Sequence, residues 1–484
     1  MYISLSPEYA VRNDINGSYF IRIDGVKSND IANFNIFHLP PFIGYLLTNI
    51  QKYPEDKVYS VLSSELGISE SSIKHFIAQL IDNPEPKLFK YSDELSVILP
   101  ARTLIRTESE RKGNTYTSLD FNPYDDFVIR RPSFPTSVNL MITTSCNTDC
   151  IYCYADRNLR PEMSLSQIKD IIIQLKEGGC FNLAFTGGDI FARKDFLNIL
   201  KFASEHGYHQ FLSTKIPIKE NMLVEIKNLG YDNFQFSLDS CDPEILNRHL
   251  HVQHDYINRI DEMLSSCDNL GLGIDIRTVI TSINGTETRL TELYRFITRH
   301  KCIKRWDLTP YFYSPYKSSS YQEHRPNNEI LRYMWNFSKR EDLSIPIYLN
   351  KIGEDGYELQ KYNNTEEFTE NNMVCSGNCS CLSILANGIC NVCEMLYEHP
   401  DFILGDAKST PIYKIWNSDR AKKIYQLPQN EAPSNSACAT CKDYNTCRLD
   451  FHKRICFSDI IKTGGSLYSP DPRCPKSKKH DFIL

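Results

Sequence analysis

The segment VNLMITTSCNTDCIYCYADR, residues 138–157, joins a strand-like run to three closely spaced cysteines. Cys146, Cys150 and Cys153 follow the run VNLMIT with the spacing C-x₃-C-x₂-C. Proteins with alternating strands and helices place their chemistry at the carboxyl ends of the strands. The segment therefore predicts an α/β domain with a thiol site at the end of its first strand.

Strand-like and helix-like runs alternate after this segment. The predicted strands cover residues 138–143, 182–187, 209–214, 233–238, 273–281 and 304–311. The predicted helices between them cover residues 164–178, 194–207, 219–230, 255–267 and 289–300. Six strands that alternate with helices indicate a parallel sheet, either flat or curled into a partial barrel.

The bulk composition excludes several classes of protein. With 484 residues, the chain is long enough for two to four domains. Its net charge of −6 argues against a general grip on nucleic acid. No run of apolar residues is long enough to cross a membrane, and the N-terminus has no secretion signal. The odd number of cysteines, 17, is a poor disulfide framework and indicates metal-binding thiols in a reducing cytoplasm.

Residues 1–100 predict a small winged-helix-like module. Asn16-Gly17 between two β-prone runs is a strong hairpin signal. Helices are predicted over 39–50, 56–67 and 68–81, the last capped by Ser69, and a closing strand pair over 87–100. The module carries 8 Lys+Arg against 12 Asp+Glu, which argues against DNA binding. Residues 101–135 are polar and proline-containing and predict an irregular linker.

The spacing of the three cysteines predicts an iron–sulfur cluster. Three thiolates hold a 4Fe–4S cluster by three irons and leave the fourth iron open, whereas a structural cluster takes four cysteines. Zinc is the competing interpretation, but a structural zinc site takes four ligands and no histidine lies near the triplet. The remaining alternative is three unrelated core cysteines.

The motif Cys146-Asn147-x-x-Cys150-x-Tyr152-Cys153 resembles that of radical S-adenosylmethionine (radical SAM) enzymes with a SPASM auxiliary-cluster domain. The resemblance implies a partial (βα)₆ barrel whose cluster binds S-adenosylmethionine at its open iron. One-electron cleavage then gives a 5′-deoxyadenosyl radical, which abstracts a hydrogen atom from the substrate. It also implies that Tyr152 contacts the cofactor and that an external donor, such as flavodoxin or ferredoxin, supplies the electron.

Further cofactor contacts follow from the same resemblance. Gly187, Gly188 and Asp189 resemble the Gly-Gly-Glu-Pro loop whose backbone takes the methionine amine, although alone Gly-Gly indicates only a tight turn. Ser237 and Arg259 stand where the subgroup contacts the cofactor carboxylate. An arginine suits a carboxylate because it binds in a bidentate manner and stays charged. The alternative for Arg259 is a solvated charge on a helix.

Asp239 is the candidate catalytic residue. Alternation in NFQFSLDS places Gln235, Ser237 and Asp239 on one face of a strand. The resemblance places Asp239 in the substrate cavity, where it could accept the proton lost on substrate oxidation. The alternative is an N-cap for the following helix at DSCDPEILNRH.

The cysteine-rich C-terminal region, residues 373–484, lacks regular periodicity and predicts a loop-rich, metal-stapled domain. The resemblance assigns it two auxiliary 4Fe–4S clusters. One set is Cys375, Cys381, Cys393 and Cys456, and the other is Cys438, Cys441, Cys447 and Cys474. Phe451 stands where the pattern has a cysteine, Cys379 could replace Cys381, and Cys390 is left over. Two zinc sites on the same thiols are the alternative.

The N-terminal module fused to this enzyme resembles the recognition element of enzymes that mature ribosomally made peptides (RiPPs). The chain then divides into the module at 1–100, a linker at 101–135, the barrel at 136–311, a connector at 312–372 and the SPASM domain at 373–484. A precursor peptide is expected to bind by its leader as an added strand and to receive a carbon–carbon or thioether cross-link. The alternatives are a sulfatase maturase that forms formylglycine and an iron–sulfur or zinc DNA-binding regulator.

Overall fold

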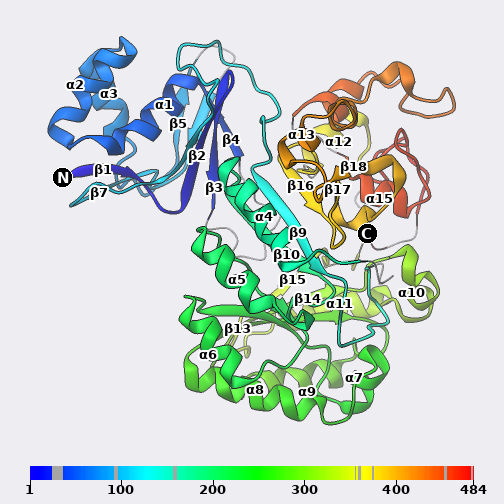
Figure 1. Ribbon diagram of the computed structural model, residues 1–484. Coiled ribbons are helices and arrows are strands. Elements are labelled where there is room, and N and C mark those ends of the chain that lie inside the picture. The colour runs from blue at the N-terminus through cyan, green and yellow to red at the C-terminus, as the bar shows by residue number, and fades with distance from the viewer. Residues whose placement is uncertain are drawn as a thin grey trace.

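The computed structural model describes residues 1–23, 36–91, 96–155, 161–354, 356–357, 361–372, 375–451, 455–480 and 483. Three parts follow one another along the chain (Figure 1). An N-terminal module of strands and helices lies beside a central α/β unit, and a cysteine-rich part lies across the central unit from it. No helix among the described residues combines the length and apolar character needed to span a bilayer.

The N-terminal module has a four-stranded sheet in the order β4-β3-β2-β8 and three helices. The predicted hairpin is confirmed, because Asp14 pairs with Gly17 and Asn16 adopts the left-handed conformation with φ of 59°. Ser69 caps the third helix by accepting a hydrogen bond from the Ser72 amide at 3.1 Å. The elements are β1 (Tyr2–Leu5), β2 (Tyr9–Asp14), β3 (Gly17–Arg22), β4 (Ile36–Leu39), α1 (Pro41–Asn49), α2 (Glu55–Leu66), α3 (Glu70–Ala78), β5 (Lys87–Lys90) and β6 (Ser96–Leu99).

The strands β5 and β6 form the predicted closing pair, and the turn between them, residues 92–95, lies outside the described residues. The prediction of an irregular linker over 101–135 is wrong. This segment contains β7 (Leu104–Thr107), antiparallel to β1, and β8 (Asn114–Thr117), parallel to β2. Each strand is only four residues long, LIRT and NTYT, so neither shows a readable periodicity. Their backbone hydrogen bonds to distant strands define them instead.

The central unit contains the predicted succession of six strands, and its parallel pairs are β9–β10, β11–β12, β12–β13 and β13–β14. The strands are β9 (Ser137–Thr143), β10 (Asn182–Gly187), β11 (Ser213–Thr214), β12 (Asn233–Ser237), β13 (Gly273–Ile280) and β14 (Ile303–Pro310). The helices are α4 (Leu165–Glu177), α5 (Phe196–Glu205), α6 (Glu220–Asn228), α7 (Pro243–Leu250), α8 (Tyr256–Leu270) and α9 (Glu287–Ile297). Of these helices, α7 was expected only as the helix at DSCDPEILNRH that Asp239 was offered as capping.

The third strand is shorter than its predicted range of 209–214, and the six strands fall into two sheets. The Phe185 amide of β10 donates to the side-chain oxygen of Gln210 at 3.1 Å. In a continuous sheet this amide would donate to a backbone carbonyl of the neighbouring strand. Here the Gln210 side chain accepts the hydrogen bond instead, and β10 and β11 belong to different sheets. The first sheet has the order β10-β9-β16-β17-β18, and the second has the order β11-β12-β13-β14-β15.

The C-terminal part continues the first sheet directly. Strand β16 runs parallel to β9, the strand that leads into the cysteine triplet. The strands and helices of the C-terminal part are β16 (Cys381–Ile384), β17 (Ile389–Asn391), β18 (Ile403–Asp406), α13 (Ile412–Trp416), α14 (Asp419–Tyr425) and α15 (Phe457–Lys462). The connector before the C-terminal part contains α10 (Ser318–His324), α11 (Asn328–Ser338), β15 (Ile347–Leu349) and α12 (Thr365–Asn371). Of these, α11 is the helix predicted from the sequence.

Two buried arginines join the three parts. Arg12 of β2 donates to the carbonyls of Gly178 and Gly179 at 2.8 and 3.0 Å, which fixes the N-terminal module to the end of α4. Arg131 stacks on the Trp416 ring at 3.4 Å from its centroid and donates to the Trp416 carbonyl at 2.9 Å. Buried guanidinium groups persist only with such partners, so these contacts define the interfaces of the central unit.

Candidate active site

A cavity of about 1200 Å³ opens at the carboxyl ends of the central strands. It is bordered by the central unit, the connector, the C-terminal part and, through Ile36, strand β4 of the N-terminal module. The N-terminal module, the central unit, the connector and the C-terminal part therefore all contribute to one site. The lining includes all three cysteines of the triplet, Cys146, Cys150 and Cys153.

The triplet occupies the loop that follows β9. The Thr148 hydroxyl lies 3.3 Å from the Cys146 sulfur and 3.4 Å from the Cys150 sulfur. Burial raises the pKa of the Cys150 thiol to about 11, while Lys215 and Thr148 act to lower it. At neutral pH this thiol is therefore protonated unless a metal replaces the proton. Metal binding would stabilise the thiolate, which burial alone disfavours.

The chemistry of these donors fits an iron–sulfur cluster. Among the described residues, no three His, Cys, Asp or Glu side chains group closely enough to hold one metal ion. A cluster makes a different demand, because each thiolate binds a separate iron. Three thiols spread around one wall of a large cavity match that demand.

Gly187 and Gly188 pass against the backbone that precedes the triplet. A Cβ atom on Gly187 would lie 2.1 Å from the Thr143 carbonyl oxygen, and one on Gly188 would lie 2.2 Å from the Ser145 carbonyl oxygen. Gly187 also has φ of 148°, in the region that favours glycine. Only glycine fits both positions, and both residues line the cavity as predicted.

Asp189 joins the glycine loop to the third strand. Its buried carboxylate accepts hydrogen bonds from the Thr214 hydroxyl at 2.8 Å, the Lys215 amide at 2.9 Å and the Phe191 amide at 3.0 Å. Burial raises the pKa of Asp189, and these donors oppose the shift. Asp189 lies in the cavity wall, where it holds two loops together.

Strand β12 presents the predicted face to the cavity. Gln235 and Ser237 line it, whereas Phe234, Phe236 and Leu238 are buried in the apolar core. The Ser237 hydroxyl accepts a hydrogen bond from Gln235 at 2.8 Å. The two-residue alternation read from the sequence therefore holds through Ser237.

Asp239 departs from both of its predicted roles. It is 1% exposed and is absent from the cavity lining, so the prediction that it faces the cavity is wrong. It also does not cap the next helix, because Asp242 accepts the hydrogen bond from the Glu244 amide at 2.9 Å. The strand ends at Ser237, and beyond it the two-residue alternation no longer applies.

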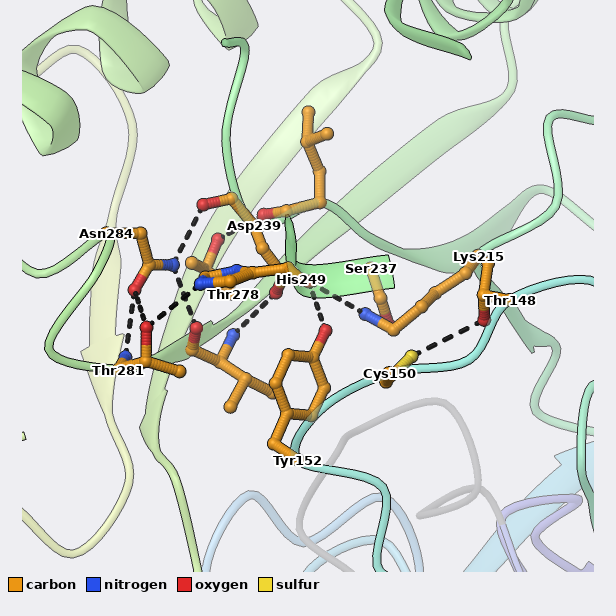
Figure 2. Close-up of polar contacts among 12 residues, drawn as sticks. Thr148, Cys150, Tyr152, Lys215, Ser237, Asp239, His249, Thr278, Thr281 and Asn284 are labelled. Carbon is orange, nitrogen blue, oxygen red and sulfur yellow. Dashed lines mark hydrogen bonds and ion pairs between the residues drawn. The ribbon is translucent and has the colours of Figure 1, made fainter. Parts of the chain in front are cut away.

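The Asp239 carboxylate lies behind two cavity residues (Figure 2). One oxygen accepts a hydrogen bond from the Tyr152 hydroxyl and lies 3.3 Å from the Lys215 ammonium. The other oxygen accepts from the Val279 amide at 2.9 Å. Asp239 therefore positions Tyr152 and Lys215, and it is these two residues that reach the cavity.

A second layer of polar groups fixes Asp239 from behind (Figure 2). Asn284 donates to the Asp239 carbonyl at 2.9 Å and accepts from the Thr281 amide at 2.8 Å. The Thr281 hydroxyl is hydrogen-bonded to His249 at 3.0 Å, and the His249 ring lies edge-on to Tyr152. Burial lowers the pKa of His249 to about 4, so it is neutral at physiological pH. Asp239 is thus held in place by a network of hydrogen bonds.

Arg259 lies away from the cavity, and the prediction that it holds the cofactor carboxylate is not supported. Its half-exposed side chain pairs with Asp255, one turn earlier on α8, at 3.3 Å. It is the solvated helix charge that the sequence offered as the alternative. Arg277 of β13 lines the cavity, as do Arg305 and Arg473. Burial lowers the pKa of Arg277, and Asp307 opposes the shift.

Sequence reasoning missed Arg277 and Lys215 as site residues. Arg277 lies in the run GIDIRTVIT, where polar residues two apart mark the strand face that points inward. Lys215 directly follows the third strand, at the end where the site lies. Both signals are present in the sequence, but neither residue matches a motif of the radical SAM family.

The first predicted auxiliary set borders the same cavity. Cys375, Cys393 and Cys456 line it. Burial, Asp459 and the nearby Cys375 and Cys393 thiols raise the pKa of Cys456. Burial raises the pKa of Cys381 to about 11, and Cys375 contributes to the shift. The structure therefore places these four thiols near one another.

The second predicted set surrounds a smaller cavity. Cys438, Cys441, Cys447 and Cys474 all line it. Burial raises the pKa of Cys447 to about 12, and Cys438 and Cys474 add to the shift. Of the cysteines left over, Cys390 lies in the apolar core, whereas Cys379 packs with Tyr425 and Phe451 and lines the large cavity.

Comparisons with known proteins agree with this geometry. Residues 140–295 match the Radical SAM superfamily, and residues 375–442 match the iron–sulfur cluster-binding domain SPASM. The chain is a radical SAM enzyme with a SPASM domain. The enzyme therefore binds S-adenosylmethionine and iron–sulfur clusters.

Curated relatives of this radical SAM enzyme include a maturase and a peptide cyclase. It is 25% identical to mycofactocin maturase MftC of Mycobacterium tuberculosis over 353 residues, which is 70% of this chain and 83% of that protein. It is 29% identical to PqqA peptide cyclase of Bradyrhizobium diazoefficiens over 119 residues, 24% of this chain and 31% of that protein.

The fold resembles that of SuiB from Streptococcus suis, solved with its precursor peptide SuiA. That structure has a TM-score of 0.64 and 17% sequence identity, and the match covers 98% of this chain and 100% of SuiB. At this identity the likeness concerns the mixed α/β fold.

Proposed function

We propose that this radical SAM enzyme is a maturase of a ribosomally made precursor peptide and that it forms a carbon–carbon or thioether cross-link. The observation that carries the proposal is the shared cavity. The triplet thiols, the first auxiliary set and the N-terminal strand β4 all border one space of about 1200 Å³. The peptide-modifying names of MftC, PqqA peptide cyclase and SuiB with its precursor support the same substrate class.

The cavity residues that match radical SAM motifs would hold the cluster and S-adenosylmethionine. Cys146, Cys150 and Cys153 hold the cluster that, with S-adenosylmethionine bound, supplies hydrogen-atom abstraction. The Gly187-Gly188 backbone approaches the methionyl amine, and Asp189 keeps this loop in place. Tyr152 lies against the cofactor, with its hydroxyl fixed by Asp239. Ser237 and Arg277, rather than Arg259, face the cofactor carboxylate.

The C-terminal thiols hold two auxiliary 4Fe–4S clusters, which makes three clusters in total. The mutual influence of Cys375, Cys381, Cys393 and Cys456 on one another's pKa values supports the first set. The shared small cavity supports the second set, Cys438, Cys441, Cys447 and Cys474. Three thiols of the first set, Cys375, Cys393 and Cys456, border the substrate space, so a cluster held there would be placed to accept an electron from an oxidised substrate. An external flavodoxin or ferredoxin supplies the reducing electron.

The N-terminal module acts as a winged-helix-like recognition element, and β7 and β8 belong to it. Strand β4 is an end strand of the module's sheet, paired with β3 among the described residues. A leader peptide adds to it as a further strand. Because Ile36, the first residue of β4, lines the cavity, a leader that runs antiparallel to β4 delivers the following residues into the cavity. The strands β9–β14 then act as one partial barrel around the substrate.

The test is anaerobic incubation of the reduced enzyme with S-adenosylmethionine and the small peptides encoded beside its gene. We expect 5′-deoxyadenosine together with a peptide that has lost two hydrogen atoms. Tandem mass spectrometry should show no cleavage between the two linked residues. A hydrazine-reactive aldehyde on a serine or cysteine would instead indicate formylglycine formation. If 5′-deoxyadenosine forms but no encoded peptide changes, the maturase proposal is wrong.

A further inference from the structure

Lys215 is a buried cation that the structure holds at both its backbone and its side chain. Its amide donates to Asp189 at 2.9 Å, and its carbonyl accepts from the Tyr256 hydroxyl. Its ammonium lies 3.3 Å from the Asp239 carboxylate and 5.2 Å from the centroid of the Tyr152 ring. Only 15% of the side chain is exposed. A lysine this constrained presents a fixed charge at a fixed place.

The charge of Lys215 faces the cysteine triplet. Figure 2 shows its side chain between the Asp239 carboxylate and the loop that carries Cys150. Lys215 lowers the pKa of Cys150 more than Asp239 raises it. Burial acts to lower the pKa of Lys215, but Asp239, Cys150 and Cys146 raise it, and the net shift is upward. The pair of Lys215 and Asp239 is therefore a dipole whose positive end points at the thiols.

The other charged pairs that contact the described triplet loop do not line the cavity. Arg193 and Glu162 form one such pair, and Glu162 accepts a hydrogen bond from the Thr144 amide at 2.7 Å. Lys317 also pairs with this loop, at 3.4 Å from Asp149, but both side chains are partly exposed and neither residue lines the cavity. Water and salt screen such an exposed pair, whereas a buried charge acts through a lower dielectric. Lys215 is thus the lysine whose charge a cluster on Cys146, Cys150 and Cys153 would sense.

We propose that Lys215 sets the reduction potential of the cluster held by Cys146, Cys150 and Cys153, with Asp239 as the group that moderates its charge. The proposal rests on the assignment of these three thiols and not on the identity of the peptide. The step is a one-electron reduction in which the cluster core goes from 2+ to 1+ and an external low-potential donor loses one electron. No bond forms or breaks and no proton moves. Lys215 stays protonated and favours the form of the cluster that carries one more negative charge.

The test is a redox titration of reconstituted enzyme without peptide or S-adenosylmethionine, followed by electron paramagnetic resonance. The relevant signal is the one missing from a Cys146/Cys150/Cys153→Ala variant. In Lys215→Met, which keeps the length of the side chain, the ratio of reduced to oxidised cluster at a fixed potential should fall about tenfold, a shift of about 59 mV to lower potential. Lys215→Arg should restore the wild-type ratio.

The Asp239→Asn variant should shift the reduction potential of the cluster in the opposite direction. It keeps the shape of the carboxylate but removes its negative charge, so the uncompensated ammonium should raise the potential of the same cluster. Lys317→Met is the matched control and should leave the potential unchanged. If the Lys215→Met variant loses this cluster during reconstitution, the reduction potentials of Lys215→Gln and Asp239→Asn test the proposal instead.

An unchanged potential in a cluster-loaded Lys215 variant, or a downward shift in Asp239→Asn, overturns the proposal. A Lys215 variant whose potential changes only after S-adenosylmethionine is added also overturns it, because Lys215 would then act on the cofactor alone. Since no peptide is present, a failure of the maturase assignment leaves these outcomes unaffected.

Discussion

Ser237 of β12 and Arg277 of β13 are partners in the parallel ladder, and both side chains line the cavity. The Arg277 Nε–H is buried without a hydrogen-bond partner among the described residues, and the nearest acid, Asp307, lies 3.7 Å from the other end of the guanidinium group. A hydroxyl beside an incompletely paired guanidinium is a ready-made place for a carboxylate.

We therefore predict that Arg277→Gln weakens the binding of S-adenosylmethionine by about 10- to 100-fold, as expected for the loss of a charge-assisted contact. Arg259→Gln should leave binding unchanged, because its exposed pair with Asp255 lies outside the cavity. Equilibrium dialysis with labelled cofactor measures both. Equal losses in the two variants, or a loss only in Arg259→Gln, would restore the role first inferred for Arg259.

The difference between these arginines shows where sequence reasoning reaches its limit. The triplet was placed by its position after the first predicted strand, and Gly187-Gly188 and Ser237 by their resemblance to radical SAM motifs. All of these residues line one cavity. The direction of a helical side chain such as Arg259 depends on how α8 rolls on the sheet, which spacing does not report. Asp239 was misplaced for a related reason, since the strand ends at Ser237 and its two-residue alternation does not extend to Asp239.

The strands β7 and β8 were missed because their signal lies in distant partners. Each is four residues long, and β8 pairs with β2 about a hundred residues earlier. The parallel pairing of β16 with β9 is likewise invisible in the sequence, although it brings the auxiliary cysteines toward the triplet. Non-local pairing of this kind is decided by packing and not by propensity.

The two aspartates near the start of α7 should differ in what they contribute to stability. Asp242→Ala removes an N-cap and should lower the free energy of unfolding by about 1 kcal/mol. Asp239→Ala should cost about 3–5 kcal/mol, because it leaves the buried Lys215 ammonium without its partner. Denaturant unfolding followed by circular dichroism measures both variants. A larger loss for Asp242→Ala would mean that the cap, and not the Lys215 pair, organises this region.

Docking of the N-terminal module should depend on Arg12. Arg12→Met leaves Asp14 without its buried guanidinium partner and removes the contacts to Gly178 and Gly179, so we expect a loss of about 3–5 kcal/mol in the stability of the module. Hydrogen exchange should then increase in β2 and β3. The control is Arg106→Met, whose pair with Glu55 is partly exposed and should contribute less than about 1 kcal/mol. Similar exchange in the two variants would show that Arg12 does not hold the module in place.

The iron content should separate ligating cysteines from core cysteines. Wild-type enzyme reconstituted without oxygen should hold about twelve irons, four for each of three clusters. Cys456→Ser should lose roughly four of them, because Cys456 lies in the cavity wall near Cys375 and Cys393. Cys390→Ser is the control, because Cys390 is a buried cysteine of the C-terminal part that lies among apolar side chains. Inductively coupled plasma mass spectrometry gives the metal count and also detects zinc. Loss of iron in Cys390→Ser with full retention in Cys456→Ser would reverse the assignment of these two residues, and zinc in place of iron at the C-terminal thiols would refute the auxiliary clusters.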